Sequence, residues 1–129
     1  MHFMLLLKGD STPDTPPPDE LVAAMNRYGA ELANAGVLLD AKGLFSSAQG
    51  ARVVYSNGQR KVVDGPFAEA KELVAGYYLI DVKSREEAIE WASRCPVEYA
   101  VSGDQEAVVE VRQAASEIEE AYPELADPR

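Results

Sequence analysis

The chain has 129 residues, of which 12 are basic and 22 are acidic, so its formal net charge at pH 7 is -10. This length favours one domain with its own core, and the acidic balance excludes a non-specific hold on nucleic acid or anionic lipid, because both need basic surface. No apolar run is long enough to cross a membrane, no secretory leader opens the chain, and the single cysteine cannot form an internal disulfide, so we expect a soluble cytoplasmic protein.

The first third of the chain predicts a strand followed by a helix. Residues 3–8 form a short apolar run that ends at Gly9, as expected of a buried strand. His2 would lie on the same face of this strand as Met4 and Leu6. After a proline-rich stretch, apolar residues recur at helical spacing from residue 20 until Gly36 ends the helix: Leu21, Met25, Tyr28 and Leu32.

The middle of the chain predicts four strands. Residues 37–45 would form the second strand, with Gly43 as a bulge or a point of close approach. Asn57-Gly58 favours a tight hairpin between the next two strands, because both residues tolerate positive φ angles. Residues 68–73 are good helix formers, but the segment is short. The strongly apolar residues 75–82 predict a central strand.

The last third predicts a helix, a strand and an acidic helix. Ser84 and Glu87 have the spacing of a capping box, and Pro96 would end the helix that they begin. Residues 106–112 alternate as in a strand, and residues 114–122 predict the final helix. This order of elements predicts an α+β fold with an antiparallel sheet and both helices on one face, and a second subunit would cover the other face.

The turn at Asp64-Gly65-Pro66-Phe67 is the most distinctive feature of the sequence. The proline keeps Gly65 out of the helical region, and Phe67 sets an aromatic ring beside a carboxylate. Asp64 has two interpretations. In the first, it accepts hydrogen bonds from its own turn; in the second, it acts as a general acid or base whose proton affinity is raised by desolvation beside Phe67.

The run from Asp64 to Glu72, with Gly76-Tyr77-Tyr78-Leu79-Ile80 after it, resembles the DGPF branch of the YCII-related family. The resemblance covers residues 1–112 and leaves residues 113–129 as an acidic helical extension. It implies a ferredoxin-like dimeric α+β barrel. The wider group is noted for a His–Asp pair suggestive of an enzyme, but this chain has no histidine on its first predicted helix. DGPF proteins are also associated with extracytoplasmic-function sigma factors.

The candidate site residues are single side chains rather than a motif. Besides Asp64, His2 is a weak catalytic candidate if the first strand is central, and otherwise a partly exposed terminal histidine. Ligand contacts are assigned to four residues: Phe67, Tyr77, Tyr78 and Arg112. The two tyrosines should point to opposite faces of their strand, and Arg112 either binds a carboxylate ligand or pairs with Glu110.

The sequence thus favours a homodimer with an inter-subunit pocket for a small molecule, and it leaves open whether a reaction takes place there. No cofactor motif and no metal-ligand spacing is present, and Cys95 reads as a small buried hydrophobic residue. The alternative is an acidic accessory protein that binds a sigma factor or another basic protein through the extension rich in Glu117, Glu119, Glu120 and Glu124.

Overall fold

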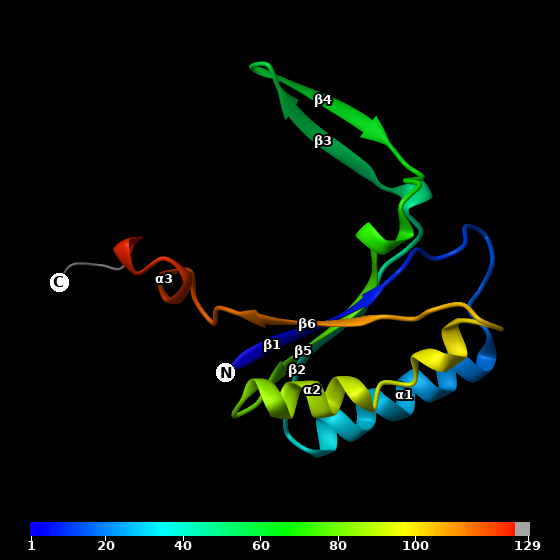
Figure 1. The fold of residues 1–129 in the computed structure, drawn as a ribbon, viewed down its shortest axis with the longest axis vertical. Helices are drawn as coiled ribbons and strands as arrows, with labels where there is room; N and C mark the ends of the chain where they lie inside the picture. Colours follow the sequence, from blue (N-terminus) through cyan, green and yellow to red (C-terminus); the bar gives the residue numbers. More distant parts are fainter. Residues whose placement is uncertain (126–129) are drawn as a thin grey trace.

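The computed structural model describes residues 1–125 of the chain. Its centre is a four-stranded antiparallel sheet in the order β2-β5-β1-β6 (Figure 1). The two inner strands are β1 (His2–Lys8) and β5 (Val74–Asp81), and the two outer strands are β2 (Leu38–Gly43) and β6 (Val109–Ala114). The expected antiparallel sheet and the central position of the strongly apolar strand are therefore confirmed.

Two helices, α1 (Asp19–Asn34) and α2 (Arg85–Ser93), cover one face of this sheet (Figure 1). The predicted cap of α2 is present, because the amide of Glu87 donates to Ser84 Oγ over 3.1 Å. Gly36 has a φ of +76° just after α1, which is the left-handed conformation expected of a glycine that ends a helix.

The core lies between the helices and the covered face of the sheet. Its most deeply buried large side chains are Leu5, Leu32 and Ile80, one each from β1, α1 and β5. The other buried members of this cluster are Phe3, Tyr28, Tyr78, Val82, Ala88 and Cys95. The expectation that Cys95 packs as a small hydrophobic residue is confirmed, and burial raises the pKa of its thiol to about 12.

The remaining two strands, β3 (Ala51–Ser56) and β4 (Gln59–Asp64), pair only with each other and form a second sheet. Their hairpin extends away from the body on the side opposite the helices (Figure 1). The predicted turn is present, with φ angles of 53° at Asn57 and 78° at Gly58. We call this hairpin, residues 51–64, the arm.

Several predicted boundaries are corrected by the structure. The last strand begins at Val109 and not at residue 106, because its pairing with β1 runs from Leu7 to His2. The segment 68–73 forms only the 3-10 turn η2 (Ala70–Glu72), and the predicted helix 114–122 shrinks to α3 (Ile118–Ala121) before η4 (Pro123–Leu125). The last four residues of the predicted 113–129 extension lie outside the described residues.

The bulge in β2 is also displaced from its expected position. The register with β5 shifts between Leu38 and Asp40, whereas Gly43 pairs regularly with Gly76. At Gly76 an added Cβ would lie 2.9 Å from the carbonyl oxygen of Lys42, so the close approach that was expected at Gly43 falls on the opposite glycine.

The four strands form an open sheet with β2 and β6 at its edges, and not a closed barrel. Within residues 1–125 no helix is both long and apolar enough to cross a membrane.

Candidate functional site

The turn that follows β4 is fixed by a close backbone contact. A Cβ atom on Gly65 would lie only 1.7 Å from the carbonyl oxygen of Ser47, so no larger residue fits at this position without a backbone shift. The amide of Gly65 donates to the carbonyl oxygen of Gly50 over 3.0 Å, and the Gly65–Pro66 peptide is cis. The turn is therefore pressed against the 3-10 segment η1 (Ser47–Gln49).

Ser47 links three distant parts of the chain. Its amide donates to Asp10 Oδ1 over 2.7 Å and its hydroxyl donates to Asp10 Oδ2 over 2.5 Å. The amide of Phe67 donates in turn to Ser47 Oγ over 3.1 Å. These two bonds from Ser47 lower the pKa of Asp10, because they stabilise its ionised form. The end of β1, the segment η1 and the Phe67 turn are thus joined at one point.

A cavity of about 360 Å³ opens beside this network. Apolar walls come from Leu44, Phe45, Leu73, Val74 and the ring of Phe67, and polar groups come from Asp10, Ser46, Ser47, Arg52 and Glu72. The Arg52 guanidinium lies 3.8 Å from the centroid of the Phe67 ring. Phe45 at the rim is 87% exposed. The cavity therefore combines an aromatic wall, a stacked cation and a carboxylate that is held by hydrogen bonds.

The structure places Phe67 in this cavity but leaves Asp64 outside its lining. Asp64 is exposed at the end of β4, opposite Ala51, and within residues 1–125 its carboxylate has no hydrogen-bond partner. It therefore neither holds the turn amides nor points into the cavity. Instead, Ser47 accepts the hydrogen bond from the turn amide of Phe67, and Asp10 holds Ser47 in place.

Asp10 and Ser47 were missed as site residues. Asp10 could have been found from its position directly after an apolar strand and Gly9, since a carboxylate at a strand end can accept hydrogen bonds from a neighbouring loop. No local sequence pattern indicates Ser47, because its hydrogen-bond partners Asp10 and Phe67 are 37 and 20 residues away.

His2 does not meet the turn, although β1 is indeed central. It pairs with Asp81 at one end of β1, whereas Lys8 at the other end pairs with Val74, where β5 leaves the turn. Six residues of strand separate the two ends, which amounts to about 20 Å. His2 therefore lies at the end of the main sheet that is far from the turn after Asp64.

The two tyrosines of β5 point to opposite faces, as expected. Tyr78 is buried under α1, where its hydroxyl donates to the carbonyl of Met25 and its ring meets Tyr28 edge-on at 5.1 Å. Tyr77 lies on the other face and its hydroxyl donates to Asp40 Oδ2 over 2.8 Å. This bond lowers the pKa of Asp40 and raises the pKa of Tyr77.

The face of the sheet that the helices leave uncovered carries a mixed surface. Register and alternation place three apolar side chains of the inner strands beside Tyr77: Met4, Leu6 and Leu79. On β6, opposite Met4, Arg112 forms an ion pair with Glu110 at 3.2 Å, which is the simpler of its two predicted roles. We call this surface the open face.

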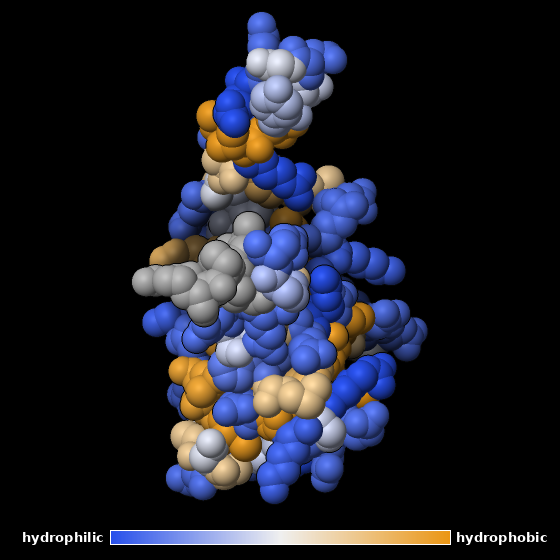
Figure 2. Space-filling model, turned by 90° about the vertical axis from the view of Figure 1, so that its left-hand side faces the viewer, coloured by the Kyte–Doolittle hydropathy of each residue, from blue (hydrophilic) through white to orange (hydrophobic). Residues whose placement is uncertain are grey.

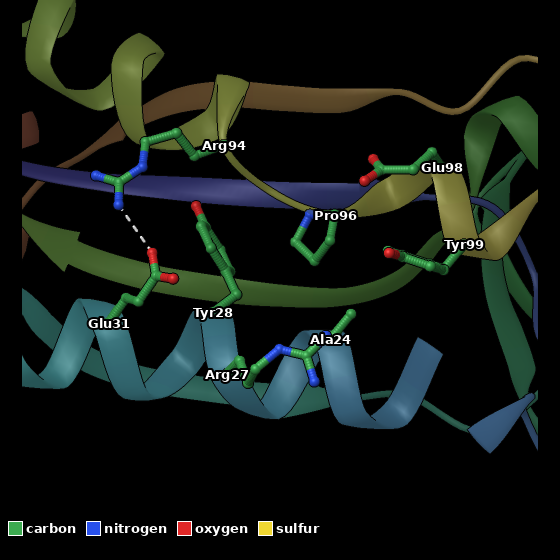
Figure 3. Close-up of a pocket in the computed structure, with 8 residues that line it drawn as sticks. All are labelled: Ala24, Arg27, Tyr28, Glu31, Arg94, Pro96, Glu98 and Tyr99. Atoms are coloured by element: carbon green, nitrogen blue, oxygen red, sulfur yellow. Dashed lines mark hydrogen bonds and ion pairs between the residues drawn. The ribbon is translucent and has the colours of Figure 1, made fainter. Parts of the chain in front are cut away.

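A second, smaller cavity of about 210 Å³ lies between α1 and the segment after α2 (Figure 3). The Glu31–Arg94 ion pair, with its two atoms 2.8 Å apart, bridges the two sides. The Tyr28 hydroxyl donates to the carbonyl of Trp91 over 2.6 Å. Because these polar groups already pair with one another across the cavity, we interpret it as part of the packing interface between α1 and α2 rather than as a ligand site.

Comparison with known proteins gives two findings. The model of the YCII-related domain matches residues 1–113. An uncharacterized protein of Rhizobium meliloti (strain 1021) is 38% identical over 73 residues, which are 57% of this chain and 56% of that protein. The chain thus aligns with little more than half of that relative. Since the family model spans most of the chain, the protein belongs to the YCII-related family.

Proposed function

We propose that the cavity beside Phe67 binds a small organic acid, in a homodimer whose open faces meet. The observation that carries the ligand class is the Arg52 guanidinium stacked on Phe67 in a cavity of about 360 Å³. Within residues 1–125 Arg52 has no ion-pair partner, and a guanidinium beside an apolar wall suits a carboxylate attached to an apolar group. The volume falls in the usual range of ligand sites.

The two carboxylates of the cavity, Asp10 and Glu72, oppose an anion, so the preference for a carboxylate ligand rests on direct contact with Arg52. Asp10 is already bonded to both the amide and the hydroxyl of Ser47. Glu72 also lines the cavity and would favour ligands that carry a donor opposite their carboxylate. The proposal therefore favours a hydroxy acid or an amino acid over a simple fatty acid.

The dimer is supported by the open face. Helices cover only the opposite face of the sheet, and the inner strands place Met4, Leu6 and Leu79 where a monomer would leave them in contact with water (Figure 1). A second copy is the simplest cover for such a face, and an isologous contact would bring Tyr77 and Asp40 of both copies together. The Gly65–Phe67 turn supports the further proposal that the chain belongs to the DGPF branch.

Any catalysis would use Asp64 as the general acid or base, since it is the one carboxylate of the turn and is not held by other groups of residues 1–125. It would have to act on a part of the ligand that protrudes from the cavity.

The ligand proposal is tested by protein-detected NMR titration with a panel of small hydroxy and amino acids. We expect shifts at Ser47, Arg52 and Phe67, and at least a tenfold loss of affinity in Arg52→Gln, because a charge-assisted bidentate pair contributes about 1.5–3 kcal/mol. Arg85→Gln, which removes an exposed arginine from the start of α2, is the matched control. Equal affinity in both variants, or shifts elsewhere only, would contradict the proposal.

The second candidate function is the acidic accessory protein that binds a sigma factor or a similar basic protein. It is favoured by one observation: the chain continues beyond the end of β6 as an acidic segment (Figure 1), in which Glu117, Glu120 and Glu124 are exposed. Such a surface would steer a basic partner more than it would add affinity. We rank this candidate below the ligand site.

A further inference from the structure

The arm has an apolar side that nothing in the described part of the chain covers. Val53 and Val62 lie directly opposite each other and are each 66% exposed. Tyr55, two residues further along the same side, is 65% exposed. Figure 2 shows the arm standing apart from the body, with apolar surface on its side and at its base. A two-stranded hairpin of this kind is marginally stable in water by itself.

The arm also differs from the body in charge. Residues 51–64 contain three of the 12 basic residues and one of the 22 acidic residues, a net charge of +2, and the remainder of the chain therefore has a net charge of -12. None of the three cations, Arg52, Arg60 and Lys61, takes part in an ion pair within residues 1–125. A basic, apolar arm is thus joined to a strongly acidic body.

We propose that the arm docks on the body of a second copy of the chain, with the Val53–Val62 side facing that copy. This inference rests on the proposed dimer and identifies the element that completes it. Charge selects this occupant. On the docking side the cation Arg60 lies near the tip of the arm, whereas Asp64 on the same side lies at its base, and the body of another copy has the opposite net charge.

The dimensions of the arm suit this role. Strands of six residues reach about 20 Å, whereas a four-stranded sheet is about 14 Å wide from edge to edge. The arm leaves the body on the side of the open face (Figure 1), so a copy whose open face meets this one lies within its reach. If each copy docks its arm on the other, the two-fold symmetric dimer forms every arm contact twice.

The register of the hairpin gives a matched pair of variants. Val53 and Arg60 lie on the docking side, whereas their neighbours Val54 and Lys61 lie on the opposite side. The variants Val53→Thr/Arg60→Glu and Val54→Thr/Lys61→Glu make the same kind of change in the same two strands. Any general loss of hairpin stability is therefore shared between them, and β-branched threonine keeps the strand preference.

Sedimentation equilibrium on the full chain tests the proposal, with hydrogen exchange of the core amides as the check of folding. We expect the wild type to be a dimer at micromolar concentration, Val53→Thr/Arg60→Glu to raise the dimer Kd at least tenfold, and Val54→Thr/Lys61→Glu to raise it less than threefold. The difference in dimer Kd between the two variants should shrink in 1 M NaCl, where the Debye length falls to about 3 Å.

The outcomes separate this inference from the proposal on which it rests. A wild-type dimer that both variants weaken equally, or that neither weakens, would overturn the docked arm and leave the dimer standing. A wild-type monomer would overturn both. The Arg52 ligand site is measured separately and is not decided by this experiment.

Discussion

Gly65 is the glycine with the least room for a side chain, because an added Cβ would lie 1.7 Å from the carbonyl oxygen of Ser47. We expect Gly65→Ala to lower the free energy of unfolding by about 3 kcal/mol, since the turn or η1 must move to admit the methyl group. Urea unfolding measures this loss. Gly43→Ala is the control, because a Cβ at Gly43 meets nothing within 4 Å. A loss no larger than that of the control would contradict the contact.

At the scale of elements, Ser47 holds η1 against the end of β1 and against the turn after β4. Ser47→Ala removes the acceptor of the Phe67 amide and one donor to Asp10, so we expect a loss of about 1–2 kcal/mol at pH 7. Ser93→Ala is the control, because the Ser93 hydroxyl only donates to the carbonyl of Ile89 in its own helix.

The pH dependence of this loss follows from Asp10. Its folded pKa is lowered from 3.8, so its contribution to stability is present above pH 3.8 and is lost as the pH falls through the folded value. The difference between wild type and Ser47→Ala should therefore narrow below pH 3.8 in urea unfolding at a series of pH values. A difference that stays constant down to pH 2 would show that Asp10 has no part in it.

At the scale of the whole molecule, the acidic segment after β6 can be removed without cutting the sheet if the chain ends at Ala114. Ending it at Arg112 would delete the pairs of Gln113 and Ala114 with β1. If the accessory function holds, the full chain should capture a purified sigma factor in a pull-down, the chain ending at Ala114 should not, and salt should weaken the capture. Equal capture by both chains would exclude the acidic segment as the binding surface.

Much of the fold was predictable from local patterns. The helix stripe ending at Gly36, the Ser84 cap and the Asn57-Gly58 turn were identified because each depends on residues close together in the sequence. The two faces of β5 were predictable for the same reason, since alternation along one strand places Tyr77 and Tyr78 on opposite sides.

The candidate site was only half predictable. Phe67 was predicted from its turn and lines the cavity, whereas Asp10 and Ser47 were not predicted, because their contacts span 20 to 37 residues. No local pattern reports which strand end meets which loop. The separation of the arm from the main sheet is of the same kind, because a strand pattern does not state its partner.

The sequence by itself thus determined the family, the antiparallel sheet with two helices, and the sharp turn at Gly65, because these depend on composition, periodicity and backbone restrictions that are local. Only the tertiary structure decided that Arg52 stacks on Phe67 beside Asp10, that His2 lies at the far end of the sheet, and that the arm stands free. The physical reason is that packing between distant segments sets these positions, and that packing is a property of the whole chain.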